Sequence, residues 1–344
     1  MGRVLTYAKA ISEALVQGME FNSDVFIFGL GVDDHKGVFG TTRDAFLKFG
    51  PARVFDTPAS ENALTGIAIG AAVNGKRPVL VHARNDFMFL ALDQMLNNAA
   101  KWKYVYGGKS TAPIVVRAII GKGWGQGPTH SQSLQSVLAH FPGIIVAMPS
   151  TPSDVKGIIL HALKSQSPVV ILEHRSLYEL EGEVAEDYYT SAFGHAEIVR
   201  VGVDVTVVAT SIMVVEAMKA AKELEKAGIS LEIIDPVTIQ PLDEHMIVHS
   251  IRKTGRLIAA DPSWQRCGFA SEIAAIAAEK AFDCLKAPVK RITWPECPCP
   301  VSKALEEEFY PNHEDIVRAA YELMGRPDAP VYGERKADTF MGPY

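Results

Sequence analysis

The chain has 344 residues, of which 48% are hydrophobic and 22% are charged, so it is long enough for two domains with sizeable cores. Its formal net charge of −6 argues against a nucleic-acid partner, which would favour a basic surface. No segment approaches the ~20 consecutive apolar residues that cross a membrane, and the first residues lack the pattern of a signal peptide. We therefore expect a soluble, cytoplasmic protein with no membrane partner.

Short apolar runs alternate with amphipathic helical segments through the first half of the chain. The runs predicted to be buried strands lie at residues 25–28, 78–82, 113–120, 144–148 and 168–172. Continuous apolar runs of this length are typical of parallel strands that are covered on both faces. The helices predicted between them lie at about 60–74, 88–102 and 152–165.

The alternation is interrupted at residues 181–202, which are richer in charge and are predicted to be a linker with one or two short strands. It resumes with strands at 204–210, 230–235, 257–260 and 289–294, and with helices at roughly 212–228, 243–253, 268–286 and 312–324. The sequence thus predicts an α/β fold with two parallel-sheet domains, residues 1–180 and 203–325. Residues 326–344 have no periodicity and are predicted to form an extended tail.

One predicted helix begins with an unusual combination of residues. Ser60 is suited to the N-cap, so Glu61 falls in the first turn, where the helix dipole stabilises its charge. The small residues that follow, between 66 and 75, would let another backbone approach closely. The alternative is an ordinary buried helix with a structural glutamate.

Two further segments carry polar groups near predicted strand ends. Residues 121–132 form a glycine-rich loop that contains His130; it could bind an anion or deliver His130 to a site, or His130 could be a surface residue. His82, Asn85, Asp86 and Phe87 follow a strand, and the carboxyl ends of parallel strands are where ligands bind. The alternative for this second segment is a polar turn.

Several of these segments, in this order and spacing, resemble beta subunits of the decarboxylating component of 2-oxo-acid dehydrogenase complexes, which belong to the transketolase-like family. The matching segments are residues 54–61, 66–72, 93–94, 98–101 and 128–132, followed by 204–210, 234–243 and 267–273. The resemblance runs from about residue 4 to 325. It implies a thiamine-pyrimidine-binding domain followed by a transketolase C-terminal-like domain.

The resemblance also implies a cofactor and partners. In this family thiamine diphosphate lies between an alpha-type subunit, which binds the diphosphate and its magnesium ion, and the beta-type subunit, which holds the aminopyrimidine. The chain would then hold no metal itself and would act in an α2β2 assembly with a beta–beta contact. In complexed relatives, a lipoyl-bearing acyltransferase is a further partner.

Individual residues match the family's functional positions. Glu61 matches the glutamate that activates the cofactor, Phe87 matches the aromatic residue that stacks on the aminopyrimidine, and Ala59 would line the same pocket. His130 matches the histidine that is placed near the substrate. The resemblance therefore implies an enzyme that decarboxylates a 2-oxo acid and transfers the acyl group.

The chain departs from the family at the end of one predicted strand. His82, Arg84 and Asn85 stand where dehydrogenase-type beta subunits usually have aromatic or apolar residues. We expect His82 and Asn85 to contribute to a more polar substrate pocket. This polarity leaves an alternative open, a transketolase-like enzyme or carboligase that moves a two-carbon unit to a carbonyl acceptor without lipoamide.

Overall fold

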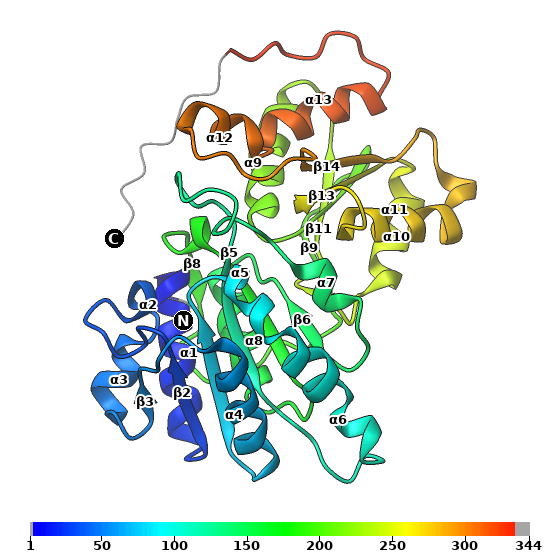
Figure 1. Cartoon of the computed structure of the whole chain (residues 1–344). Coiled ribbons are helices and arrows are strands. Elements are labelled where there is room, and N and C mark those ends of the chain that lie inside the picture. The colour runs from blue at the N-terminus through cyan, green and yellow to red at the C-terminus, as the bar shows by residue number, and fades with distance from the viewer. Residues whose placement is uncertain (1–2, 334–344) are drawn as a thin grey trace.

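The computed structural model describes residues 3–333, and two sheets with mainly parallel strands organise them (Figure 1). The first sheet has seven strands: β2 (Val25–Gly29), β3 (Val54–Phe55), β4 (Arg77–His82), β5 (Val115–Ile120), β6 (Ile145–Ala147), β7 (Val169–His174) and β12 (Thr238–Gln240). Their order is β12-β6-β7-β5-β4-β2-β3. All neighbours are parallel except β12, which runs antiparallel to β6.

The second sheet has five strands in the order β14-β13-β10-β11-β9. They are β9 (Glu197–Arg200), β10 (Val205–Ala209), β11 (Leu231–Asp235), β13 (Leu257–Trp264) and β14 (Lys290–Trp294). Only β9 is antiparallel to its neighbour. The predicted α/β fold with two parallel-type sheets is confirmed. In Figure 1 the second half of the chain lies above the first half.

Helices cover both faces of the first sheet, which explains why its strands are apolar throughout. One face is covered by α1 (Tyr7–Phe21) and α8 (Pro152–Ala162). The other is covered by α4 (Glu61–Val73) and by a helical run from residue 85 to 105. The single helix predicted at 88–102 is wrong in detail, because the run divides into α5 (Asn85–Met88), a 3-10 turn, a π-helical segment (Asp93–Ala99) and α6 (Ala100–Val105).

The remaining helices are short connections in the first half or lie around the second sheet. They are α2 (Gly37–Gly40), α3 (Arg43–Phe49), α7 (Gln135–Ala139), α9 (Ile212–Lys226), α10 (Glu244–Thr254), α11 (Phe269–Lys280), α12 (Lys303–Phe309) and α13 (His313–Leu323). None of the helices in residues 3–333 is both long and apolar enough to cross a membrane. Residues 326–333 contain no helix or strand, and the rest of the predicted tail lies outside the described residues.

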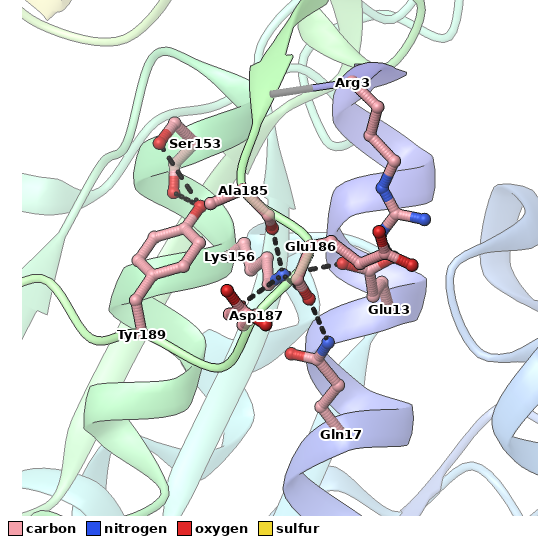
Figure 2. A network of polar contacts seen from close by, with 9 residues as sticks. All are labelled: Arg3, Glu13, Gln17, Ser153, Lys156, Ala185, Glu186, Asp187 and Tyr189. Atoms are coloured by element: carbon pink, nitrogen blue, oxygen red, sulfur yellow. Dashed lines mark hydrogen bonds and ion pairs between the residues drawn. The ribbon is translucent and has the colours of Figure 1, made fainter. Parts of the chain in front are cut away.

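The charged connection after the first sheet is fastened by one lysine (Figure 2). The strand β8 (Glu181–Val184) pairs with β1 (Arg3–Thr6), and the next three residues pass the fully buried side chain of Lys156 on α8. Its Nζ donates to the carbonyls of Ala185, Glu186 and Asp187 and to the carboxylate of Glu13 on α1. This one ammonium group therefore ties α1, α8 and the connection together.

Candidate active site

The carboxyl ends of β2, β4, β5 and β7 lie at the same edge of the first sheet. These strands are consecutive parallel neighbours, so the residues that follow Gly29, His82, Ile120 and His174 are brought to that edge. Ligands of open parallel sheets bind at such an edge. The strand ends and the loops that leave this edge contain His82, Asn85, Phe87 and His130, and the segment after β3, the parallel neighbour of β2, contains Ala59 and Glu61.

Glu61 lines a pocket at this edge, and it begins α4 as the sequence predicted. The other lining residues are Leu30, Pro58, Ala59, Ser60, Leu64, Leu80, Val81, His82, Ala83 and Phe87. Ser60 occupies the N-cap position but makes no capping hydrogen bond with its side chain. The Glu61 side chain is half-buried, and no hydrogen bond or ion pair reaches its carboxylate from residues 3–333. The helix dipole therefore acts on a carboxylate that can still accept a ligand's hydrogen bond.

His82 forms the floor of the same pocket at the end of β4. Its side chain is buried, and its Nε2 atom has no hydrogen-bond partner among the described residues. Burial lowers the pKa of His82 to about 4, so the imidazole is neutral at pH 7. A buried ring nitrogen without a partner is costly and is most often explained by a missing ligand or water.

Asn85 lies beneath the glycine-rich loop rather than in either pocket. Its amide donates to the carbonyl of Gln132 at 2.9 Å, and its oxygen accepts from the backbone of Leu134 at 3.1 Å. The neighbouring Asp86 accepts two further bonds from Gln132, at 2.9 and 3.2 Å. Asn85 was expected at the pocket edge, but in the structure its side chain is hydrogen-bonded to the backbone of the loop.

His130 projects from that loop onto the ring that separates two pockets. The ring centroids of Phe87 and His130 are 5.2 Å apart and the planes are nearly perpendicular, at 88°. The hydroxyl of Thr129 lies 3.0 Å from Nδ1 of His130. Phe87 lines the pocket of Glu61 and also the wider pocket of His130. The structure thus brings Glu61, Ala59, His82, Phe87 and His130 to one place.

The wider pocket contains residues that the sequence did not single out as a site. Arg84, Gln126 and Arg175 line it, and both arginines are buried. Leu30 and Ala83 join Phe87 as residues common to both pockets. A buried ion pair supports this edge from below, because Arg117 on β5 donates to Glu173 on β7 at 2.5 and 2.9 Å. Arg84 was noted in the sequence only as a departure from the family, two residues after β4, and the only sequence signal for Arg175 is its place directly after β7.

These residues have the chemistry that an aminopyrimidine needs. The carboxylate of Glu61 can accept a hydrogen bond from a ring N–H, the Phe87 ring offers a stacking surface, and the Nε2 atom of His82 is a further polar contact. Residues 3–333 contain no group of three or more His, Cys, Asp or Glu side chains that could hold a metal ion. The chemistry of these side chains therefore suits the pyrimidine end of the implied cofactor, while the cavity that this chain forms by itself, about 20 Å³, is smaller than the ring.

Two family models match the chain. The transketolase pyrimidine binding domain matches residues 3–181, and the transketolase C-terminal domain matches residues 194–316. A solved structure titled "Split gene transketolase, inactive beta4 tetramer" superposes with a TM-score of 0.75 at 23% identity, covering 93% of this chain and 98% of that one. At that identity the likeness shows the fold alone.

Curated relatives match the chain over nearly its full length. The beta subunit of acetoin:2,6-dichlorophenolindophenol oxidoreductase from Bacillus subtilis is 41% identical, over 95% of this chain and 99% of that protein. The beta subunits of 2-oxoisovalerate dehydrogenase and of the pyruvate dehydrogenase E1 component, from the same organism, are 38% and 37% identical. Each of these two matches covers 93% of this chain and 98% of the relative.

Proposed function

The chain belongs to the transketolase-like family of dehydrogenase beta subunits, and on that premise we propose that it is the beta-type subunit of a thiamine diphosphate-dependent enzyme. The enzyme decarboxylates a 2-oxo acid and transfers the acyl group. The single observation that carries this proposal is Glu61, a helix-start carboxylate that lines a pocket beside Phe87 with no partner in residues 3–333.

Three residues of this chain would hold the cofactor's aminopyrimidine. The Glu61 carboxylate would accept a hydrogen bond from a ring N–H, Phe87 would stack on the ring, and Ala59 would form a wall. When bound, thiamine diphosphate supplies a nucleophilic carbon and an electron sink for decarboxylation. A charge-assisted hydrogen bond in a half-buried pocket holds the ring in one orientation and one protonation state.

His130 would act at the substrate side of Phe87. The Thr129 hydroxyl lies 3.0 Å from Nδ1 of His130, so Nε2 is the nitrogen that we propose meets the substrate. There it would hold or deliver a proton at the carbonyl oxygen. His82 would contact the ligand as a neutral imidazole, because burial lowers its pKa to about 4.

The proposal requires partner chains. An alpha-type subunit would bind the diphosphate and its magnesium ion and complete an α2β2 assembly. A beta–beta contact would use the exposed side of α4. There the Ile67 side chain is 58% exposed, and Gly70 faces open space, with no atom within 4 Å of the position that a Cβ would occupy. A lipoyl-bearing acyltransferase would be the acyl acceptor. All four cysteines are free thiols, as in a cytoplasmic enzyme.

The carboligase alternative is not favoured. The curated relatives reported above are beta subunits of oxidoreductases and dehydrogenases. We therefore take acyl transfer after decarboxylation as the reaction class.

The test combines the chain with its alpha-type partner, thiamine diphosphate and magnesium, and measures carbon dioxide release from a series of 2-oxo acids. Glu61→Gln keeps the size of the side chain but removes its charge. A charged hydrogen bond contributes about 1.5–3 kcal/mol, so we expect kcat/KM to fall roughly 10- to 150-fold. Loss of less than about threefold would show that Glu61 does not act on the cofactor.

A matched control is available on another helix. Glu244 also occupies the first turn, at the start of α10, and lies outside both pockets. Glu244→Gln should leave kcat/KM unchanged. Turnover by the isolated chain, without an alpha-type partner, would contradict the shared site.

A further inference from the structure

The pocket beside His130 has a largely apolar lining, and most of the charged side chains in it are cationic. Lys9, Lys36, Arg43, Arg84 and Arg175 line it, against one carboxylate, that of Asp34. Three of the five are exposed to water, but Arg84 and Arg175 are only 5% and 8% exposed. Buried arginines are rare unless an anion is nearby.

Arg84 donates only to neutral groups. Its Nη2 donates to the amide oxygen of Gln126 at 2.7 Å, and its Nη1 donates to the carbonyl of Gly121 at 3.3 Å. No carboxylate in the described part of the chain lies within ion-pair distance of it. The carboxylates that act on it electrostatically are those of Asp86 and Glu306, whose oxygens accept hydrogen bonds from Gln132 and from the backbone of Gly125.

Arg175 lies within cation–π distance of two aromatic rings. Its guanidinium lies 4.8 Å from the ring centroid of Phe39 and 4.5 Å from that of Trp124. Both aromatic residues have a left-handed backbone, with φ of 59° and 48°. Such backbone is costly for residues other than glycine and concentrates at ligand sites. Contacts with both rings restrict the movement of the guanidinium.

The two arginines converge on one neutral acceptor. Nη1 of Arg175 lies 3.5 Å from the Gln126 amide oxygen, to which Arg84 also donates. Gln126 is exposed, so its side chain can swing into solvent. An oxyanion in its place would receive charge-assisted, bidentate hydrogen bonds, which are the strong ones.

We propose that Arg84 and Arg175 bind a second anionic group, a carboxylate or a phosphate, carried by the 2-oxo acid substrate at the end remote from its reacting carbonyl. This inference rests on the proposed function. The pocket of Glu61 and the pocket of the arginines meet at Leu30, Ala83 and Phe87. A substrate that reacts beside Phe87 can therefore extend its far end to the arginines. The substrate class is a 2-oxo acid with an anionic side chain.

The test compares substrates of equal length with and without the second charge. The assembled holoenzyme is assayed with 2-oxoglutarate, with 2-oxopentanoate and with a 2-oxo acid that ends in a phosphonate. We expect kcat/KM for one of the two charged substrates to exceed that for 2-oxopentanoate by at least about tenfold. Whether the carboxylate or the phosphonate is preferred identifies the anion. A preference for 2-oxopentanoate overturns the proposal.

Variants then assign the preference to the arginines. Arg84→Met and Arg175→Met should each lower kcat/KM for the preferred charged substrate roughly 10- to 150-fold, and for 2-oxopentanoate less than about threefold. Arg266→Met is the control, because Arg266 is exposed and lies outside both pockets; it should change neither value more than about threefold. Equal losses on all substrates would mean that the arginines hold the loop or the reacting carboxylate, and would overturn the proposal.

A binding experiment separates this inference from the proposed function. If the wild-type holoenzyme turns over no acid in the full series of 2-oxo acids used to test the proposed function, that function fails. Calorimetric titration of the full chain with inorganic phosphate then decides the anion site by itself. Binding that Arg84→Met weakens at least about tenfold supports the site, and the absence of binding overturns it.

Discussion

Two buried cationic side chains in the first half of the chain have very different surroundings. Lys156 has four oxygen acceptors, the Glu13 carboxylate and the Ala185 carbonyl at 2.6 Å and two further carbonyls at 3.1 and 3.2 Å (Figure 2). Arg84 has the two neutral acceptors described above, and the closer of them belongs to an exposed glutamine. Removing either charge from water is costly.

The difference distinguishes a buried cation that stabilises the fold, Lys156, from a buried cation that binds a ligand, Arg84. Around Lys156 the fold itself supplies the compensating oxygens, and they come from two segments of the chain, α1 and residues 185–187. Around Arg84 the compensation is incomplete until an anion arrives. The first arrangement stabilises the folded chain. The second leaves a desolvation penalty, which a bound anion would offset. The predictions below challenge this distinction, beginning with the largest effect.

Replacing the satisfied cation should cost stability and leave catalysis unchanged. Lys156→Met removes the donor of the Ala185 and Asp187 carbonyls and one of the two cations paired with Glu13, which keeps Arg3. Breaking a buried pair costs about 4 kcal/mol. We expect the free energy of unfolding, measured by urea denaturation of the full chain, to fall by about that amount. At temperatures where the variant is folded, kcat/KM of the holoenzyme should match the wild type.

The control for Lys156 is the exposed Lys164, whose Nζ lies 4.4 Å from the ring centroid of Tyr188 in the same connection. Lys164→Met should cost less than about 1 kcal/mol. If Lys156→Met lowers the free energy of unfolding no more than this control, the hydrogen bonds from Lys156 to residues 185–187 are not what holds the connection in place.

Buried strands and the start of α4 could be predicted from the sequence because their signals are local. An apolar run such as residues 78–82 and a helix start at Ser60 and Glu61 depend on neighbours within a few residues. The resemblance then supplied Phe87 and His130. By contrast, β12 is a three-residue strand that pairs across the two halves of the chain, and no local pattern marks it.

Arg175 and Asn85 show why the site was only partly predictable. Arg175 follows a strand like many surface arginines, and its burial depends on Phe39 and Trp124, which come from distant loops. Asn85 is polar and follows a strand end, which predicted a pocket residue. The turn of α5 directs it toward the loop at Gln132 instead. The direction of a side chain after a strand depends on the turn, which composition does not reveal.

His82 adds a third outcome for a buried basic group, because it avoids the charge by remaining unprotonated. Its pKa is lowered by burial to about 4 in the folded chain, against 6.5 for the free side chain. The unfolded chain therefore binds more protons between these values, and stability is lost as the pH falls from about 6.5 to 4. One pKa unit corresponds to about 1.4 kcal/mol, so the loss due to His82 approaches about 3 kcal/mol.

The measurement compares wild type with His82→Phe, since other groups also titrate in this range. The difference in their free energies of unfolding should change by about 3 kcal/mol between pH 6.5 and 4 and remain constant above pH 7. A difference that is independent of pH would mean that His82 is solvated and charged in acid, and that the pocket floor is open to water.

Gln126→Glu should give the arginine site an internal carboxylate, like the one that Glu13 provides for Lys156. A carboxylate at this position would lie between the Arg84 and Arg175 guanidiniums and give Arg84 an internal counter-charge, as Glu13 does for Lys156. Because residue 126 is exposed, the gain in the free energy of unfolding should be about 1 kcal/mol or less. The same change should abolish the preference for a substrate with a second anionic group, because that group would now meet a fixed negative charge.

Gln126→Met is the matched variant, which removes the acceptor without adding a charge, and it should keep the preference. If Gln126→Glu keeps the preference as well, the anion does not bind between the two arginines. Lys156 and Arg84 would then differ in their hydrogen-bond partners but not in having a structural role as against a ligand-binding role.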